Sequence, residues 1–390
     1  MSELLLFHCF TNIYIKTVMI VRNQEKISQT QLMMTTFMYS FGSHGFIETP
    51  IISIGNYSSW IIMIIANLLA MLLVLAAVTV TLKFPHRSFL DGGGMVVGKW
   101  LHVCTLLYML FFFFHLGAQI LRQFIDYMTQ TYFPKTPDEA LLFLFTFVVI
   151  VAVRYGVESI VRFAQMLFFL VMIAGFTIPI FLLKDIDSDM AIAFVNRFEL
   201  PVIWEGVIYI IPWYADTVIF IFVMHLLSDQ PKTTKSIVTG TALMTLMYVP
   251  TLMMTIFMFG PHFAADLTGS GSELIRQINY VNFIENIDLV YISVWMTGIF
   301  VKISICLFVS CIIVAKLLRV ADYRRHVNAL GLCLIGLSIH MSENFAEMNE
   351  FFMRSWAGFA WTVILLPVLY WLIAKIRRSG EQKTEKRESL

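Results

Sequence analysis

The sequence predicts an all-α polytopic membrane protein with ten transmembrane helices, arranged as a five-plus-five inverted repeat in which helices one and six are broken. Three observations support this prediction. Of the 390 residues, 58% are hydrophobic and 14% are charged, whereas soluble domains have about 45–50% apolar and about 25% charged residues. Ten stretches are long enough to cross a bilayer, which takes about 20 residues each. Glycine or proline interrupts the first and the sixth stretch.

The ten predicted spans form one membrane domain over residues 29–376. They cover residues 29–53, 60–82, 100–126, 139–156, 161–183, 203–227, 237–260, 286–318, 327–345 and 355–376. Residues 1–28 are expected to be a cytoplasmic N-terminal segment. They contain three basic residues and no small-residue cleavage site, so a signal peptide is not expected. Met19 is an alternative start of translation. Residues 377–390 are polar and are expected to form a disordered cytoplasmic tail.

The distribution of basic residues predicts that both termini are cytoplasmic. With the N-terminus inside, 20 of the 27 Lys and Arg fall on the cytoplasmic side and six on the outer side, as the positive-inside rule requires. The one left over, Lys302, lies in the middle of span eight. The net charge of +1 argues against a nucleic-acid partner, because phosphate binding needs a basic excess.

Polar residues accompany the interruptions of spans one and six. Span one contains Gly-Ser-His-Gly at residues 42–45, followed by Glu48 and Pro50, and span six contains Pro-Trp-Tyr-Ala-Asp at residues 212–216. Broken helices at corresponding positions of two halves indicate a transporter fold with its substrate site at the membrane midplane. The alternative is that these glycines and this proline mark only kinks or close packing, since both residues are common in membrane helices.

A small ligand is expected to bind at these interruptions. Exposed helix ends supply partial charges that attract a carboxylate and an ammonium, which fits an amino acid, although a sugar or nucleoside could use the same backbone groups. The candidate ligand-binding residues are Gly42, Ser43, His44, Gly45, Tyr108, Pro212, Trp213, Tyr214 and Trp295. The candidate intramembrane charges are Glu48, Asp216 and Lys302.

Lys302 needs a protein partner, because a cation at the bilayer centre costs about 2.5–3.5 kcal/mol even on the lenient insertion scale. The partners within reach are carbonyls of span one, Glu48 and Asp216. One interpretation is functional: the lysine replaces a bound cation or acts as a proton-linked switch. A second is structural: the lysine is half of a buried ion pair. Snorkelling towards the membrane surface is the third interpretation.

No constellation for catalysis or metal binding is present. The sequence has no phosphate-binding Walker motif, no nucleophile elbow, no HExxH and no paired CxxC. The five cysteines are scattered and lie mostly within apolar runs. We therefore expect no enzyme activity, no cofactor and no metal.

Several short motifs resemble the endospore germination permease family, the B subunits of spore germinant receptors within the amino acid, polyamine and organocation transporter superfamily. They occur in the family's order along the chain: ISQTQ from Ile27, Pro50, Trp60, Phe84-Pro85, Gly98-Lys99, LRQFIDYMTQTYFPKTP from Leu121, GVESIVR from Gly156, and FIENIDLVYISVWMTGIFVKIS from Phe283 to Ser304. The family's span-eight lysine corresponds to Lys302. Asp216 and His44 depart from it, since the family more often has Glu and a small or aliphatic residue there.

The resemblance implies a ten-span membrane protein that senses a germinant such as an amino acid, a sugar or a nucleoside. It also implies two partners, a larger A subunit and a lipoprotein C subunit, and a location in the spore inner membrane or the cell membrane. It does not imply transport. A proton-coupled amino-acid transporter, with Lys302 or His44 titrating, and a channel for water or ions along Glu48, Asp216 and Lys302 stay open as alternatives.

Overall fold

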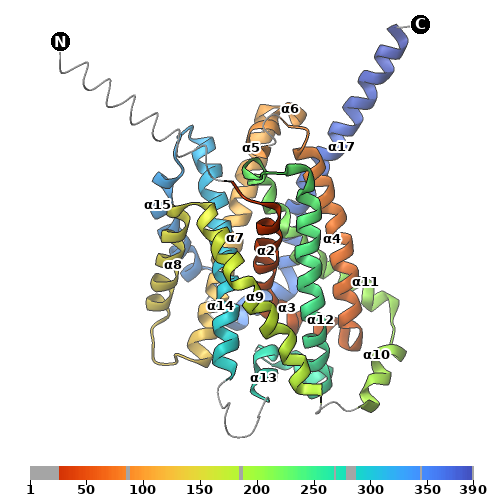
Figure 1. Cartoon of the computed structure of the whole chain (residues 1–390), viewed down its shortest axis with the longest axis vertical. Coiled ribbons are helices and arrows are strands. Elements are labelled where there is room, and N and C mark those ends of the chain that lie inside the picture. Colours follow the sequence, from red (N-terminus) through yellow and green to blue (C-terminus); the bar gives the residue numbers. More distant parts are fainter. Residues whose placement is uncertain are drawn as a thin grey trace, which may run out of the picture.

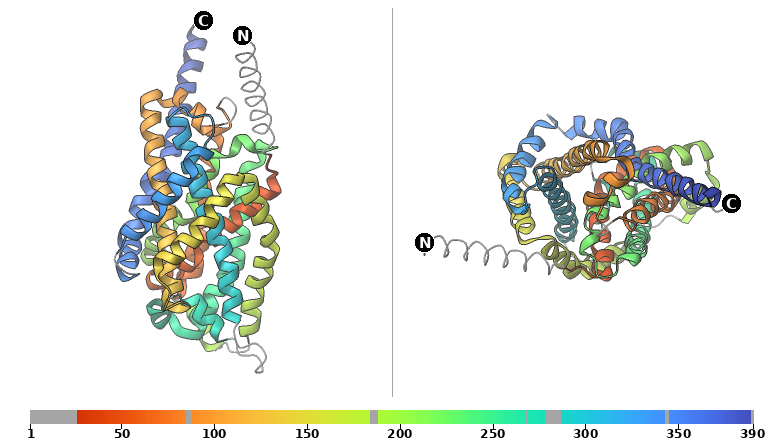
Figure 2. Two further views of the ribbon diagram at one scale, coloured as in Figure 1. Left: turned by 90° about the vertical axis from the view of Figure 1, so that its left-hand side faces the viewer. Right: turned by 90° about the horizontal axis from the view of Figure 1, so that it is seen from above.

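A computed structural model describes residues 26–84, 88–183, 188–267, 269–277, 287–342 and 345–388. Almost all of these residues are helical. The long helices run roughly parallel to the long axis of the molecule (Figures 1 and 2). The C-terminal end of α17 lies at the same end as the short helices α5 and α6, and the short helices α10 and α13 lie at the opposite end (Figure 1). The prediction about residues 1–25, including the alternative start at Met19, lies outside the described residues.

The described helices follow the predicted spans in order. They are α2 (Gln29–Phe41), α3 (His44–Gly55), α4 (Ser59–Thr81), α5 (Phe89–Gly92), α6 (Gly94–Val97), α7 (Lys99–Thr131), α8 (Asp138–Tyr155), α9 (Val157–Leu182), α10 (Ala193–Asn196), α11 (Leu200–Ala215), the 3₁₀ helix η5 (Asp216–Phe222), α12 (Thr233–Asp266), α13 (Ser270–Arg276), α14 (Ile287–Leu317), α15 (Arg324–His340), α16 (Phe345–Phe351), the π-helical η8 (Phe352–Trp356) and α17 (Ala357–Glu388). Helices α2 and α3 together form span one, and α11 with η5 forms span six.

Within the described residues, seven helical runs are long and apolar enough to cross a membrane. Helix α8 has 18 residues but carries charged residues at both ends, and α15 has only 17 residues. Helix α2 has 13 residues because span one is interrupted after it. The all-helical membrane fold is confirmed, whereas the count of ten spans stays a prediction.

Span one is fixed at its start by the ISQTQ motif. The Ser28 hydroxyl accepts a hydrogen bond from the Gln31 backbone N–H, and the Gln31 side chain accepts one from the Ser28 N–H, which is a capping box. Ile27 exchanges backbone hydrogen bonds with the segment after span six, donating to Leu226 and accepting from Ser228 at 3.0 Å each. The beginning of span one and the end of span six are therefore joined.

The two interrupted spans lie inside the bundle. Helix α2 contacts α9, α12 and α14, and α3 contacts α11 and α12. The run α11–η5 and helix α14 are buried along most of their length, whereas α9 and α17 expose most of their surface. In a membrane the exposed apolar surfaces face lipid, so the buried polar residues of α2, α3, η5 and α14 are the ones that need protein partners.

The C-terminal tail differs from the expectation. Helix α17 continues to Glu388, so residues 377–388 are helical where the sequence favours disorder. The tail is rich in Arg, Lys, Glu and Gln, which have high helix propensity, and α17 already supplies the nucleus from which the helix can continue.

Candidate functional site

The interruption of span one is a tight turn between α2 and α3. The Ser43 N–H bonds the Ser40 carbonyl and the Phe46 N–H bonds the Ser43 carbonyl, both at 3.1 Å and both across three residues. The hydrogen bonds are thus of the 3₁₀ type, and they interrupt the α-helical pattern between α2 and α3. Gly42 permits close packing here, because a Cβ on it would lie 2.6 Å from the Gly298 carbonyl oxygen of α14.

The interruption of span six comes at Asp216, four residues after the proline. Helix α11 continues through Pro212 to Ala215, and η5 begins at Asp216. Proline has no N–H to bond the Ile208 carbonyl, and the Trp361 indole of α17 donates to that carbonyl at 2.9 Å instead. The Ile208 carbonyl is therefore satisfied within the protein, and the α-helix continues past Pro212 until the tighter 3₁₀ segment begins at Asp216.

Lys302 and Asp216 form a buried ion pair between α14 and the start of η5. The Lys302 Nζ lies 2.5 Å from Asp216 Oδ2, and both side chains are fully buried. The ammonium also lies 3.9 Å from the centre of the Tyr39 ring of α2. Of the three partners expected for Lys302, the structure places Asp216 in contact with it. The pair therefore connects both interrupted spans with span eight.

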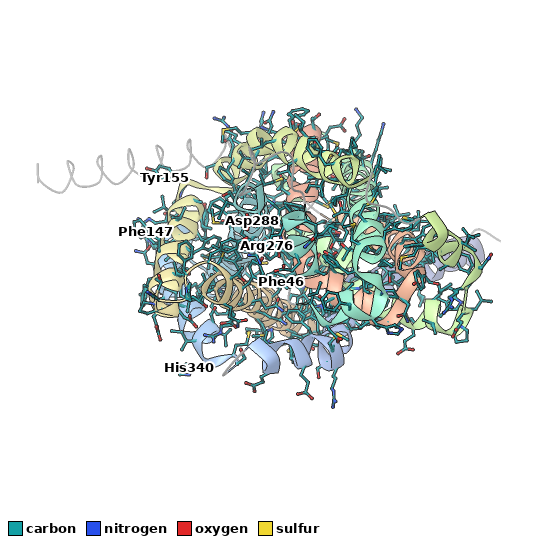
Figure 3. The ribbon with its side chains drawn as sticks, turned by 90° about the horizontal axis from the view of Figure 1, so that it is seen from below. Phe46, Phe147, Tyr155, Arg276, Asp288 and His340 are labelled. Atoms are coloured by element: carbon teal, nitrogen blue, oxygen red, sulfur yellow. The ribbon has the colours of Figure 1, made fainter. Side chains whose placement is uncertain are left out.

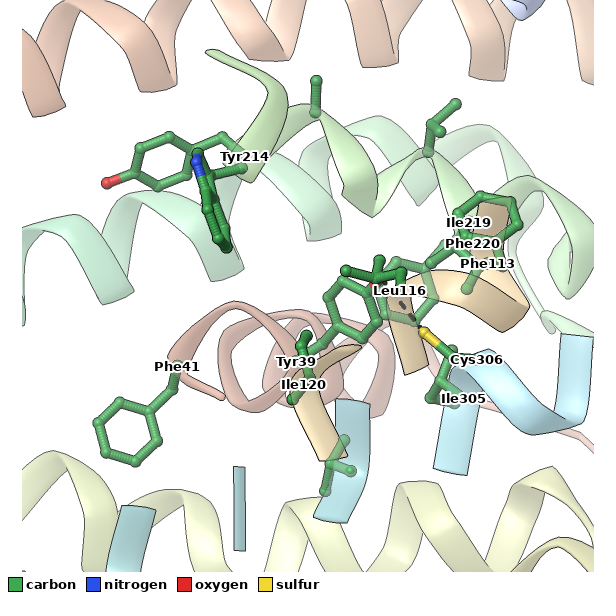
Figure 4. Close-up of a cluster of buried hydrophobic side chains, with 14 of the residues drawn as sticks. Tyr39, Phe41, Phe113, Leu116, Ile120, Tyr214, Ile219, Phe220, Ile305 and Cys306 are labelled. Carbon is green, nitrogen blue, oxygen red and sulfur yellow. Dashed lines mark hydrogen bonds between the residues drawn. The ribbon is translucent and has the colours of Figure 1, made fainter. Parts of the chain in front are cut away.

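Tyr39 sits among apolar side chains next to this ion pair. Figure 4 shows it between Phe220 of η5 and Cys306 of α14, with the Tyr39 hydroxyl and the Cys306 sulfur 4.0 Å apart. The Tyr39 and Phe220 rings meet edge to face, with centroids 5.4 Å apart. The surroundings are thus dry and aromatic, which strengthens the attraction between the two charges.

Several buried polar atoms near the two interruptions have no hydrogen-bond partner in the described part of the chain. They are Ser40 Oγ, Ser43 Oγ, His44 Nε2 and Asp216 Oδ1. His44 uses its other nitrogen, Nδ1, which is 2.7 Å from the Ser40 carbonyl oxygen. Buried polar atoms usually bond to protein, water or a ligand. This part of the molecule therefore offers both donors and acceptors to a polar ligand, as the sequence predicts for residues 42–45.

Glu48 lies one turn further along α3 and bonds to α12. Its Oε2 accepts a hydrogen bond from the Tyr248 hydroxyl and its Oε1 accepts one from Thr255, at 2.6 Å each. Tyr248 also packs edge to face on His44, with ring centroids 4.4 Å apart. Hence Glu48 is hydrogen-bonded to residues of span seven, whereas Lys302 and Asp216 form an ion pair with each other.

Trp295 of α14 covers the same part of α3. A Cβ on Gly45 would lie 2.4 Å from its ring, and the Phe46 ring lies 5.0 Å away, centre to centre. A cavity of about 30 Å³ adjoins Glu48, between these rings and helix α13. Figure 3, a view from this end of the molecule, shows Phe46, Arg276 and Asp288 near the middle of the bundle and Tyr155 and His340 at its edge.

Polar contacts close the bundle around this cavity. The Tyr127 hydroxyl of α7 donates to Ser272 of α13 at 2.6 Å, and Arg276 of α13 lies 3.3 Å from Asp288 of α14. Tyr132 also donates to Asp288, at 3.2 Å. Burial, with the nearby Tyr127 and Asp288, raises the pKa of Tyr132, so its hydroxyl keeps its proton as a donor.

Two predicted ligand-binding residues lie elsewhere in the bundle. Tyr108 is 37% exposed and its hydroxyl lies 2.7 Å from the Thr362 hydroxyl, so it joins α7 to α17. Trp213 stacks on Phe352 and packs against Trp356, with 5.2 Å between ring centroids in each case. Tyr214, in contrast, points towards α12, where its hydroxyl accepts a hydrogen bond from Thr245 at 3.0 Å.

The residues that sequence reasoning missed are the hydroxyl-bearing partners. Tyr248 and Thr255 bind Glu48, and Tyr39 contacts Lys302. A signal for the first two is present in span seven. Its hydroxyl residues recur every three, four or seven positions and therefore share one helix face. They are Thr241, Thr245, Tyr248 and Thr255.

Comparison with protein families matches residues 26–346 to the family described as "Spore germination protein". Three similar bacterial proteins have related descriptions. Spore germination protein XB of Bacillus anthracis is 23% identical over 303 residues, which cover 76% of this chain and 82% of that protein. Spore germination protein YndE of Bacillus subtilis is 21% identical over 334 residues, which cover 83% of this chain and 88% of that protein. Spore germination protein KB of the same species is 23% identical over 340 residues, which cover 84% of this chain and 88% of that protein.

Solved transporter structures share the fold. A Na⁺-coupled sialic acid symporter superposes with a TM-score of 0.64 over 89% of this chain and 80% of its own, at 11% identity. The transporter Mhp1, of the nucleobase-cation-symport-1 family, gives a TM-score of 0.59 over 84% of this chain and 74% of its own, also at 11% identity. The likeness establishes the fold of a multi-pass membrane transporter.

Proposed function

The chain belongs to the spore germination protein family, and we propose that it binds a small germinant between its two interrupted spans and signals this binding to other germination proteins. The family is one of membrane receptors and permeases of germination, not of enzymes. The proposed ligand-binding residues at the interruptions are Ser43, His44 and Asp216, with the ligand an amino acid, a sugar or a nucleoside.

The observation that carries this proposal is the group of unpartnered polar atoms at the interruptions, next to the ion pair of Lys302 and Asp216. A ligand that hydrogen-bonds to Asp216 changes the balance of that pair, because Oδ2 of the carboxylate lies on Lys302 whereas Oδ1 has no hydrogen-bond partner in the described part of the chain. The pair joins α14 to η5, and a ligand that favours one arrangement of these helices shifts the population of the molecule towards it.

The partners in the proposal are a larger A subunit and a lipoprotein C subunit, which receive the movement of the helices. The proposed location is the spore inner membrane, with both termini in the cytoplasm. The excess of basic residues in the cytoplasmic loops supports this orientation. The germination proteins similar to this chain support the complex as the setting in which it works.

The test uses Ser43→Ala in spores. Spores with the native chain are screened against amino acids, sugars and nucleosides, and the germination rate is measured as a function of the concentration of each active compound. Ser43 is fully buried and its hydroxyl has no described partner, so its removal leaves the stability of the free protein unchanged or slightly higher. We expect the concentration for half-maximal germination to rise at least about tenfold, because a ligand hydrogen bond is lost.

The control is Thr146→Val in α8. Thr146 is also fully buried and its hydroxyl also lacks a described partner, but it lies on a different helix from the interruptions. We expect Thr146→Val spores to germinate as native spores do, and both variants to respond normally to chemical germination that bypasses receptors. An unchanged dose–response of Ser43→Ala spores would refute ligand binding at this turn.

The second candidate function is proton-coupled uptake of an amino acid. The likeness of the fold to two solved symporters favours it. In this alternative Lys302 exchanges a proton with the cytoplasm during each cycle, and the ligand crosses the membrane. A channel for water or ions needs a hydrated path along Glu48, Asp216 and Lys302, whereas all three side chains are buried and bonded within the bundle.

A further inference from the structure

Glu48 is a buried carboxyl group without a cationic partner among the described residues. Its side chain is 1% exposed, and both carboxylate oxygens accept hydroxyl hydrogen bonds, from Tyr248 and Thr255. Each hydroxyl also lies within hydrogen-bond distance of a backbone carbonyl, Tyr248 of that of His44 and Thr255 of that of Thr251, so each has an alternative acceptor for its single proton. Among the described residues no Lys, Arg or His forms an ion pair with it, in contrast to Asp216 and Lys302. Hydroxyl groups stabilise a buried carboxyl group in either protonation state, and a cation bound beside it would pair with the ionised state.

The cavity beside Glu48 is small and partly aromatic. Its volume is about 30 Å³, and its walls include the rings of Phe46, Tyr127, Tyr291 and Trp295. The Trp295 ring centroid lies 5.0 Å from that of Phe46 and 5.7 Å from that of Tyr127, so the rings form a compact aromatic cluster. Aromatic faces attract cations, and the attraction is stronger at sites without water.

Two glycines set the size of this cavity. A Cβ on Gly271 of α13 would lie 2.7 Å from Glu48 Oε2, and a Cβ on Gly45 would overlap the Trp295 ring. The backbone of α13 thus approaches the carboxylate closely, and Trp295 packs against the backbone of α3 at Gly45. Any larger residue at either position would fill the space in front of the carboxylate.

We propose that Glu48 and the surrounding aromatic rings form a binding site for a primary ammonium group. The ammonium belongs either to a free small amine or to an organic germinant that carries one, such as an amino acid. The carboxylate supplies the counter-charge, and Trp295, Tyr127 and Phe46 contact the cation through their rings. The site lies on α3 beyond the turn, separate from the pair of Lys302 and Asp216, and its link to germination rests on the proposed function.

An ammonium group fits this site better than a metal ion does. Alkali and alkaline-earth ions need several oxygen ligands, whereas the cavity is lined by four aromatic residues, three glycines, one carboxylate and Ser272, whose hydroxyl is already bonded to Tyr127 and Gly269. Each oxygen of that carboxylate already lies on one hydroxyl, so the carboxylate alone does not complete the oxygen shell of a metal ion. A polar N–H donor needs only one lone pair of the carboxylate and uses the aromatic faces for the rest of its charge.

The test measures binding to the purified full chain in lipid nanodiscs, by the ligand-induced rise in unfolding temperature. The probes are methylammonium, L-alanine, L-lactate, methanol and potassium chloride at equal ionic strength. L-lactate has a hydroxyl in place of the ammonium of L-alanine, and methanol has a hydroxyl in place of the ammonium of methylammonium. We expect methylammonium or L-alanine to raise the unfolding temperature and the other three to have no comparable effect. Binding of methylammonium indicates that a free amine suffices, and binding of L-alanine alone indicates an amine carried by a larger germinant.

The variant is Glu48→Gln, which keeps the size of the side chain and removes its charge. We expect the amine to bind at least about tenfold more weakly to Glu48→Gln than to the native chain. The control is Glu139→Gln, which removes an exposed carboxylate at the start of α8 and should bind as the native chain does. Tyr248→Phe serves as a second variant that removes one of the two hydroxyl donors.

The proposal fails if neither amine stabilises the native chain, if lactate or methanol stabilises it equally, or if potassium does. It also fails if Glu48→Gln and Tyr248→Phe both bind the amine as the native chain does. The comparison of amines with neutral analogues needs no variant, so it decides the matter even if Glu48→Gln does not fold. Because the readout is binding and not germination, it is separate from the spore test of Ser43.

Discussion

Lys302→Met is expected to lower the stability of the protein by about 3–5 kcal/mol, the usual cost of leaving one charge of a buried ion pair unpaired. Lys302 Nζ lies 2.5 Å from Asp216 Oδ2 and neither side chain is exposed, so Asp216 would be left as a buried anion without its counter-charge. Thermal unfolding of the purified protein in detergent measures the effect, together with the yield of folded protein from membranes.

The double variant Lys302→Met/Asp216→Leu is expected to recover most of this loss. Apolar residues of similar size can replace a buried ion pair at little cost, because both desolvation penalties disappear together. Arg162→Met is the surface control, since Arg162 pairs with Glu158 on an exposed face of α9 and should change stability little. If the single and the double variant were equally stable, the pair would not carry buried charges as described.

Gly45→Leu is expected to lower stability by about 1–3 kcal/mol through overpacking and to abolish the response to germinant. Even the Cβ would lie 2.4 Å from the Trp295 ring, so α3 or α14 has to move. Such a movement displaces the wall of the cavity beside Glu48 and the turn that carries Ser43. Unfolding temperature and the germination rate of spores measure the two effects.

Two further variants distinguish the steric overlap with Trp295 from other effects of Gly45→Leu. Gly45→Leu combined with Trp295→Ala should regain stability, because the ring that it overlaps is gone. Gly336→Ala in α15 is the matched glycine control: a Cβ there meets no atom within 4 Å, so the helix should be unchanged or slightly more stable. A fully stable and responsive Gly45→Leu protein would contradict the close contact between α3 and α14.

The fold could be predicted from sequence because the bilayer restricts the possible structures. Long apolar stretches must be helices when water cannot satisfy their backbone, and this prediction is confirmed. The ends of the helices are less predictable than their order. Hydropathy indicates where a segment leaves the membrane but not whether it stays helical in water, and α17 continues as a helix after residue 376.

The candidate site was predictable where a charge had to be buried. Lys302 lies in the middle of an apolar span, and a partner among a few acidic residues was therefore expected, as found in Asp216. Tyr108 could not be assigned, because its place on the bundle depends on the rotation of α7, which a uniformly apolar helix does not reveal. The carbonyl that Pro212 leaves without an intrahelical partner is bonded by Trp361, 153 positions away from Ile208, and such a long-range contact could not be predicted from the local sequence.

The two buried acids illustrate how similar residues acquire different roles. Asp216 has a lysine within the bundle, whereas Glu48 has hydroxyl groups and aromatic rings. Sequence alone made Asp216 and Glu48 equal candidates as partners of Lys302. The packing of α3 on α12 and α13 gives Glu48 hydroxyl partners instead of the lysine and places it next to a cavity of its own.

The measurement that tests the central claim most directly is accumulation of a radiolabelled germinant by proteoliposomes that contain the purified chain. The ligand is the compound to which spores with the native chain respond. A chain that senses its ligand without transporting it should bind the label saturably, at most about one molecule per protein, with no further uptake under an imposed proton gradient. Accumulation far above this stoichiometry, abolished by a proton uncoupler, would contradict the account and establish the chain as a transporter.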